Sequence, residues 1–411
     1  MTNRRLFFII HSMSNIACYF NNLSIINALG RNASEVVANL LNNRADNLAI
    51  YDELFSGRKT WVGKVTAKLH DIPPKLARFN CRNNQLLASA YLDIEQDVEQ
   101  LKKQYGSHRI GIVLGTSTSG IASSEAAFKQ YFRTNSYPET YDYRQQEIGS
   151  CSEFLAQFAG ITGINYTIST ACSSSGKAIA AAYRLIKAGY CDAVVVGGSD
   201  SLCELTLNGF DSLDLLSPSI CNPFSINRRG LNIGEGAALF ILSKIPAPIK
   251  LLGVGEASDG YHIVAPDPQG VGAKLAIKQA LQTANIKPED IGYINLHGTG
   301  TNKNDAMEAL VINELFENQP YCSSTKPLLG HTLGAAGAQE LGLCWLLLSE
   351  QHNPNKLLPP QIWDQQQDLQ LPKINLIAKQ TQWHSPIFMS NSFAFGGSNV
   401  SLIIAQDKEM T

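Results

Sequence analysis

Apolar and polar positions along the chain predict buried strands that alternate with amphipathic helices. The apolar run 110–115 predicts a buried strand, and a helical pattern at about 93–105 precedes it. Residues 291–296 form a second apolar run, preceded by a helical pattern at about 272–284. Each predicted strand leads into a loop of Gly, Thr or Ser. Strands that alternate with helices in this way predict an α/β fold.

A second pair of segments extends the similarity between two parts of the chain. Residues 234–242 and 396–404 each place a glycine turn before an apolar strand, and the two pairs occur in the same order. Self-similarity of this kind indicates an internal duplication. We therefore expect an α/β fold of two similar halves, 1–245 and 246–411, joined where prolines interrupt the pattern.

Cys172 lies where a predicted strand, 163–168, turns into a predicted helix. The unpaired N–H groups and the dipole at the amino end of a helix favour a thiolate, which is the nucleophile that thioester chemistry needs. Backbone N–H groups at such a turn are also suited to bind an oxyanion. The alternative is a buried structural cysteine, since cysteine is common in apolar cores.

Two of the eight histidines lie in loops of small residues at the ends of predicted elements. His297 opens the loop 297–305, and His331 lies within 326–337, before a helix predicted at 338–348. Small neighbours leave room for a ligand, and neither loop has the spacing of a usual metal site. A single histidine is more often structural, but two in similar loops favour a ligand site.

A glycine turn at 396–397 separates two predicted strands and follows Phe393 and Phe395. The turn alone explains the glycines. The two rings need cover, because they are apolar and lie on a loop. They either pack on the core or line an apolar ligand path.

Composition narrows the choice of partners and of compartment. The 411 residues carry a formal net charge of −2, which gives no electrostatic reason to expect nucleic acid or an anionic membrane as the main partner. Nine scattered cysteines without a CxxC pair argue against disulfides and a zinc site, and suit the cytoplasm. No stretch predicts a transmembrane helix, and the apolar run after Arg5 is too short for a signal peptide. Met13 is a candidate start, which would leave residues 1–12 outside the native protein.

Four motifs follow one another along the chain. They are the turn at Cys172, the His-Gly-Thr-Gly-Thr loop, the Gly-His loop that ends in Gly-Ala-Ala-Gly, and the Phe-Gly-Gly turn. Together they resemble the β-ketoacyl-acyl-carrier-protein synthases of the thiolase superfamily, over about residues 78–405. The resemblance implies a thiolase-like fold of duplicated βαβαβαββ halves, layered α-β-α-β-α. It implies decarboxylative condensation of an acyl chain with malonyl-acyl carrier protein, in fatty-acid, polyketide or aryl-polyene synthesis. It further implies no bound cofactor or metal, substrates held on phosphopantetheine, and a dimer with a second copy or a related synthase-like subunit.

The resemblance also implies a role for each matching residue. Cys172 would take the acyl chain, while His297 and His331 would hold the malonyl thioester and assist its decarboxylation. The backbone N–H groups of Cys172 and Phe395 would form an oxyanion hole, and the Phe395 ring would gate the cavity. A charged pair and two phosphopantetheine-binding threonines would support them, namely Lys326, Glu340, Thr299 and Thr301.

Two positions depart from the pattern of the fatty-acid elongating members. Thr118 falls where those members often place a bulky aliphatic residue in the acyl pocket, so we expect room for a longer or stiffer chain such as a polyene. Ala394 stands where glycine is common beside the gate, and its Cβ is expected to stiffen the loop.

Two rival functions stay open. A thiolase shares the fold, but it calls for a second, acid–base cysteine in the turn where this chain has Phe395. A chain-length-factor subunit is a catalytically silent partner with the same fold, but it lacks the nucleophile that Cys172 supplies. The initiating and type III synthases use a Cys-His-Asn set, whereas this chain offers two histidines.

Overall fold

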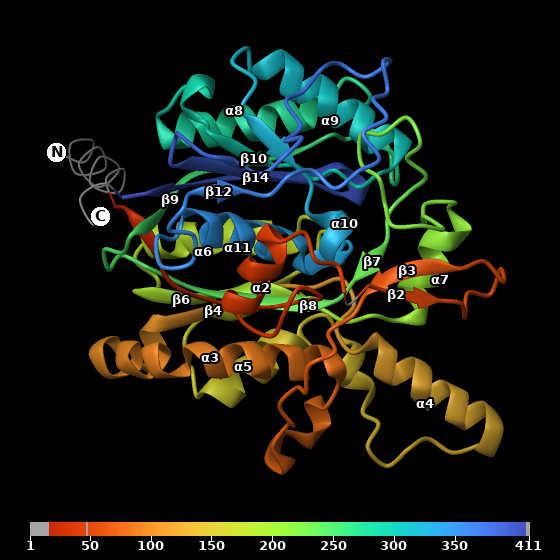
Figure 1. Ribbon diagram of the computed structural model, residues 1–411. Helices are drawn as coiled ribbons and strands as arrows, with labels where there is room; N and C mark the ends of the chain where they lie inside the picture. Colours follow the sequence, from red (N-terminus) through yellow and green to blue (C-terminus); the bar gives the residue numbers. More distant parts are fainter. Residues whose placement is uncertain (1–15, 47, 408–411) are drawn as a thin grey trace.

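Layers of helix alternate with layers of strand in the computed structural model, which describes residues 16–46 and 48–407 (Figure 1). The candidate start Met13 and the segment 1–12 lie outside the described residues. Helices lie on the outside of each sheet layer and between the sheet layers. From the lower outer layer through the middle to the upper one, these are α3 (Arg82–Tyr105), α5 (Ser150–Ala159), α6 (Ser174–Lys187), α11 (Ala336–Leu348), α8 (Val271–Ala284) and α9 (Asn302–Leu315).

The main sheet has ten strands, and its two halves repeat the same arrangement of strands from the centre outward. From the centre outward, one half is β1 (Cys18–Ile26), β8 (Gly236–Ser243), β6 (Ala193–Asp200), β4 (Ile110–Gly115) and β5 (Asn165–Ile168). The other is β9 (Ile249–Ser258), β15 (Ser398–Gln406), β14 (Ile387–Phe393), β10 (Tyr293–Asn295) and β11 (Tyr321–Ser323). Within the described residues, the two halves of the sheet pair through Cys18 and Tyr19 of β1, which lie opposite Leu251 and Lys250 of β9.

The sheet order confirms the duplication predicted from the sequence. Strands β4 and β10, the first predicted pair, are both fourth from the junction of the halves. Strands β8 and β15, the second pair, are both second from it. The layered, duplicated α/β fold is therefore confirmed.

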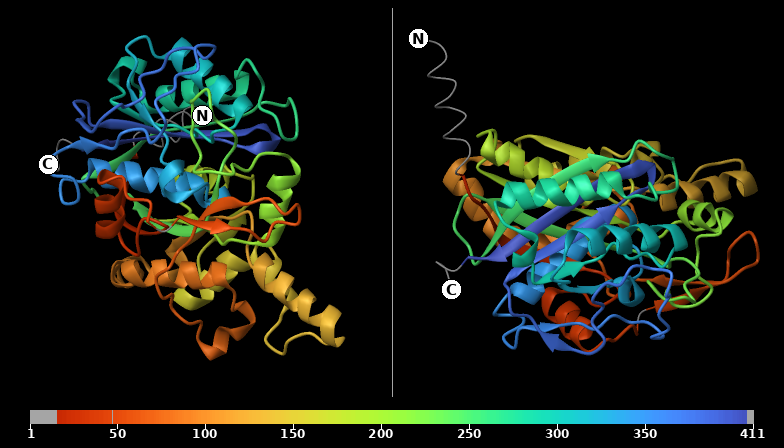
Figure 2. Two further views of the ribbon diagram at one scale, coloured as in Figure 1. Left: turned by 45° about the vertical axis from the view of Figure 1, so that its right-hand side comes forward. Right: turned by 90° about the horizontal axis from the view of Figure 1, so that it is seen from above.

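Smaller elements surround the layers. Helix α4 (Ile121–Thr134) projects away from the lower helical layer in two views (Figures 1 and 2). The other elements are α2 (Ala33–Leu41), β2 (Leu48–Tyr51), β3 (Thr60–Gly63), α7 (Glu204–Ser212), β7 (Ile233–Gly234), α10 (Lys326–Leu329), β12 (Leu357–Leu358) and β13 (Thr381–Gln382). None of the described helices combines the length and apolarity needed to cross a membrane.

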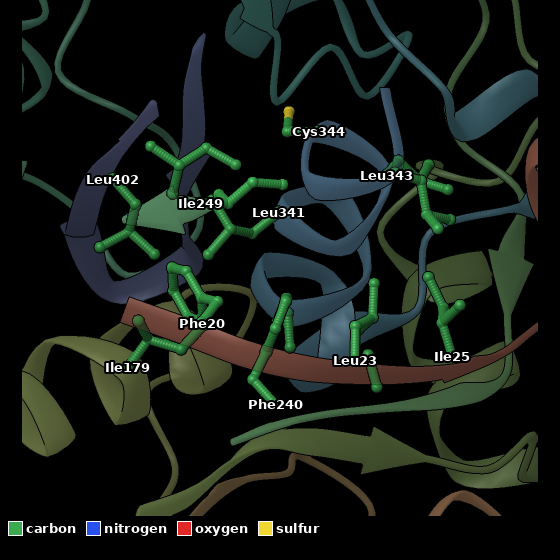
Figure 3. Packing of buried hydrophobic residues seen from close by; sticks show 14 of the residues in the cluster. Phe20, Leu23, Ile25, Ile179, Phe240, Ile249, Leu341, Leu343, Cys344 and Leu402 are labelled. Atoms are coloured by element: carbon green, nitrogen blue, oxygen red, sulfur yellow. The ribbon is translucent and has the colours of Figure 1, made fainter. Parts of the chain in front are cut away.

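The largest core packs the middle helices against both sheet layers. Figure 3 shows Phe20 of β1, Phe240 of β8 and Leu402 of β15 around Leu341 of α11. Helix α11 is buried at every position except Trp345. A helix that is apolar all round is expected where protein covers it on all sides. This explains why α11 presents no polar face to solvent, although it carries the buried Gln339 and Glu340.

Glycines allow the middle helices to approach β4 and each other closely. A Cβ on Gly115, at the end of β4, would lie 2.2 Å from the backbone nitrogen of Ser175 in α6. A Cβ on Gly337, in α11, would lie 2.7 Å from the backbone nitrogen of Gly176. The amino ends of α6 and α11 are therefore held against β4 and against each other by contacts that no larger residue permits.

We predict that Gly115→Ala destabilises the protein and displaces the start of α6. The added methyl group meets backbone atoms, which cannot rotate away, so the free energy of unfolding should fall by roughly 1–3 kcal/mol. Chemical denaturation followed by circular dichroism measures the change. Gly149→Ala is the matched control, since a Cβ at Gly149 meets no atom within 4 Å. Equal denaturation midpoints for the two variants would contradict the prediction.

Candidate active site

Cys172 lies on the tight turn between β5 and α6, two residues before the helix begins. The preceding residue, Ala171, has a left-handed φ of +51°. Ser174 holds this conformation, because its hydroxyl donates to the carbonyl of Ala171 at 2.6 Å and accepts from the N–H of Thr170 at 2.8 Å. The turn presents a cysteine side chain that is only 6% exposed.

The two histidines from the C-terminal half meet Cys172. The Nε2 atom of His331 lies 3.0 Å from the Cys172 sulfur. The rings of His297 and His331 are nearly perpendicular, with centroids 5.4 Å apart. One nitrogen of each ring and the sulfur lie within 4.8 Å of one another, and no further side-chain ligand joins this group among the described residues. The structure thus gathers three residues that are up to 159 positions apart.

Burial sets the charge state of all three groups. It raises the pKa of the Cys172 thiol to about 11, although the charge of Lys326 and the N–H of Phe395 oppose the rise. Burial also holds the pKa of His297 and of His331 well below the ordinary value, and Lys326 lowers both further. Burial therefore disfavours the thiolate that the helix end was expected to favour, and the opposing contributions of Lys326 and of the N–H of Phe395 are smaller.

Lys326 and Glu340 lie directly behind the histidines. They form an ion pair with side chains that are 1% and 2% exposed. The Lys326 ammonium also donates to the backbone carbonyl of His297. The pair thus ties the loop of His297 to α11, and its positive end favours neutral imidazoles.

Two acidic residues of α9 fix the loop of His297, and the sequence analysis missed both. The Glu308 carboxylate accepts from the N–H groups of His297 and Gly298, each at 2.7 Å. Burial raises its pKa to about 8. Asp305 accepts from the N–H groups of Gly300 and Phe224, at 3.2 and 2.8 Å. Both residues lie in the first two turns of the helix that follows the loop. That position is the sequence signal that could have identified them.

A cavity of about 570 Å³ leads from the three catalytic candidates to the surface. Thr299 and Thr301 line it, and their hydroxyl oxygens lie 2.9 Å apart. Phe395 and Ala394 line it as well, and the Phe395 ring stacks on Phe210 of α7 with centroids 5.4 Å apart. Phe210 was not singled out from the sequence, because its contact with Phe395 spans two distant segments.

Ala394 fits its loop without strain. Its φ of −99° and ψ of 158° are ordinary extended values, which any residue can adopt. Gly396 and Gly397 carry the positive φ angles of the turn, 76° and 73°. The Cβ of Ala394 therefore imposes no conformational cost at this position.

Thr118 lies against the buried carboxylate of Asp200. Its hydroxyl donates to Asp200 at 2.7 Å, and it is not among the residues that line the cavity. Asp200 also accepts from the hydroxyl of Thr116 and from the N–H of Ala335, at 2.7 and 3.1 Å. Thr118 therefore gives no structural ground for a widened acyl pocket. Its contacts instead tie the loop after β4 to the segment that follows His331.

Two family models match most of the chain. The N-terminal domain of β-ketoacyl synthases matches residues 31–246, and the C-terminal domain matches residues 249–358.

Similar proteins carry related names. The chain is 31% identical to 3-oxoacyl-[acyl-carrier-protein] synthase 1 of Buchnera aphidicola subsp. Baizongia pistaciae, over 93% of this chain and 97% of that protein. It is also 31% identical to nodulation protein E of Rhizobium meliloti, over 72% and 76%.

A solved structure is more similar still. A ketosynthase (ApeO) in complex with its chain length factor (ApeC), from Xenorhabdus doucetiae, contains a chain that is 45% identical, with a TM-score of 0.91. The match covers 95% of this chain and 98% of that chain. The family models, the relatives and the duplicated fold agree. The chain belongs to the β-ketoacyl synthases, the condensing acyltransferases of fatty-acid and polyketide synthesis.

Proposed function

We propose that Cys172, His297 and His331 carry out a decarboxylative Claisen condensation between an acyl chain on Cys172 and a malonyl thioester on acyl carrier protein. The observation that carries this proposal is the 3.0 Å contact between His331 and the Cys172 sulfur, with His297 beside it at the inner end of the cavity. A nucleophile with two neighbouring neutral imidazoles suits both halves of that reaction.

Acylation begins from neutral partners. The Cys172 sulfur attacks the acyl thioester, the bond from the carbonyl carbon to the pantetheine sulfur breaks, and the acyl chain remains on Cys172. The thiol proton passes through Nε2 of His331 to the departing pantetheine sulfur. The N–H groups of Cys172 and Phe395, which both act on the Cys172 sulfur, are suited to hold the oxyanion of this step.

Condensation uses the histidines as hydrogen-bond donors. Neutral His297 and His331 hold the carbonyl oxygen of the malonyl thioester, while the malonyl carboxylate leaves as carbon dioxide and its bonding electrons form an enolate. The enolate carbon attacks the acyl group on Cys172, the bond from the acyl carbon to the Cys172 sulfur breaks, and the thiolate that leaves takes up one proton from solvent. Lys326 supports this role, since its charge disfavours imidazolium and so preserves neutral N–H donors.

The structure favours an active synthase over the rival functions. A silent chain-length-factor subunit has no need of a cysteine within hydrogen-bond distance of a histidine. A thiolase calls for a second cysteine in the turn after β14, where Phe395 lies, and every other described cysteine lies outside the cavity lining. Incubation with malonyl carrier and a panel of acyl carriers would identify the acyl chain, and with it a fatty-acid, polyketide or aryl-polyene pathway.

The proposal includes a carrier protein and a second subunit. The name of the similar complex describes a ketosynthase that assembles with a chain length factor. In this chain β5 is an edge strand of the main sheet, and α4 carries Phe132 with 83% of its surface exposed. An unpaired strand edge and an exposed aromatic ring are features that a related synthase-like subunit could cover.

We predict that Cys172→Gln lowers condensation by about three orders of magnitude or more but keeps or raises malonyl decarboxylation, because the histidines remain. Carbon dioxide release and intact-mass analysis of the carrier measure the two activities. Adding His297→Ala to this variant should then abolish decarboxylation. Condensation at the wild-type rate in Cys172→Gln would overturn the choice of nucleophile.

We also predict that alkylation of Cys172 by iodoacetamide accelerates steadily between pH 7 and pH 10. Thiolate is the reactive form, and with a pKa of about 11 its fraction rises by about tenfold per pH unit across this range. Peptide mass spectrometry after timed labelling measures the rate, and Cys172→Ala identifies background labelling. A rate that levels off below pH 8 would indicate a resting thiolate and contradict this assignment.

A further inference from the structure

The solvent end of the catalytic cavity is built from two segments held together by a backbone hydrogen bond. The N–H of Gly230 donates to the carbonyl of Gly300 at 2.9 Å. Arg229 precedes the first glycine, and Lys303 follows the second by three residues. Both side chains belong to exposed residues that line the cavity, whereas Cys172 is buried at its inner end.

Most other charged residues of this rim are already engaged. Arg228 is paired with Asp368 at 2.6 Å, and both side chains are nearly buried. Asp214 is paired at 2.7 Å with Arg58, which Asp211 shares.

His262 is used as an acceptor. Its Nδ1 atom accepts from the N–H groups of Val264 and Ala265, at 3.0 and 3.1 Å. His262 therefore uses this nitrogen within its own loop.

Arg229 and Lys303 remain as the uncompensated cations of the rim. Neither forms an ion pair with any of the residues 16–46 and 48–407. Asp211 and Asp214 share the single cation Arg58, which leaves one negative charge. Arg229 and Lys303 carry two positive charges, so the rim still has an excess of positive charge. An arginine and a lysine that face a ligand channel without partners suit an anionic group of the ligand.

The proposed reaction specifies where such an anion would lie. The thioester end of the carrier's arm must reach Cys172, and Thr299 and Thr301 line the path between. The other end of the arm is a phosphate diester, so it must lie where the lining residues are exposed. We propose that Arg229 and Lys303 bind this phosphate and thereby select phosphorylated arms over free pantetheine. This inference rests on the proposed function of the cavity.

Acidic side chains on the carrier protein offer the same chemistry, so the test removes the protein. Octanoyl-phosphopantetheine and octanoyl-pantetheine, which differ only in the phosphate, are compared as acyl donors to Cys172 by intact-mass kinetics. The wild-type protein should use the phosphorylated donor about tenfold more efficiently at low salt, and the preference should fall as salt rises. In Arg229→Gln/Lys303→Gln the preference should shrink to less than about twofold.

The matched control is Lys103→Gln/Lys278→Gln, which removes two exposed lysines of α3 and α8 and should keep the wild-type preference. Equal use of both donors by the wild-type protein would overturn the inference, as would a preference that survives in the double variant. A variant that slows only transfer from intact acyl carrier protein would assign the two cations to acidic residues of the carrier instead. If neither donor acylates Cys172, the proposed function itself fails.

Discussion

The buried ion pair of Lys326 and Glu340 is the interaction on which the rest of the site depends. Removing two charges from water costs several kcal/mol per ion, and their mutual attraction repays this only with good geometry. Here the ammonium also donates to the carbonyl of His297, while one oxygen of Glu340 has no hydrogen-bond partner. A pair of apolar residues could fill the same space, so stability alone does not explain the pair. The positive charge of Lys326 beside two histidines explains the pair, because that charge opposes protonation of the imidazoles.

Small residues bring the two halves of the duplicated fold together at the amino ends of α6 and α11. Cys172 comes from the N-terminal half, and both histidines come from the C-terminal half. The helices that follow Cys172 and His331 meet at Gly176 and Gly337, and the Ser175 hydroxyl accepts from the N–H of Ala338 at 2.9 Å. A Cβ on Gly337 would lie 2.7 Å from the backbone nitrogen of Gly176, and a Cβ on Gly176 would lie 2.7 Å from the Val400 side chain of β15. The run of Ser and Gly after Cys172 is therefore a packing requirement as well as a means of giving substrate access.

The sequence predicted the parts of the molecule that local pattern encodes. The strands β4 and β10, the turn at Cys172 and the two histidine loops follow from apolar runs and from glycine placement. Asp200 and Phe210 could not be found in this way, because their partners lie far away in the chain and only the fold brings them close. The contact of Thr118 with Asp200 could not be found from the sequence for the same reason, since the two residues are 82 positions apart.

Burial also explains why the charge state of Cys172 could not be derived from the helix end alone. A helix dipole acts through local geometry, which a sequence can suggest, whereas desolvation depends on every residue that covers the site. Desolvation disfavours the thiolate and both imidazolium ions, which favours uncharged groups where the proposed reaction would take place. A malonyl carboxylate that enters such a site loses water without gaining a cation at Cys172 or the histidines. That environment favours the loss of carbon dioxide, because charge then moves from the poorly solvated carboxylate onto an enolate oxygen that His297 and His331 can hold.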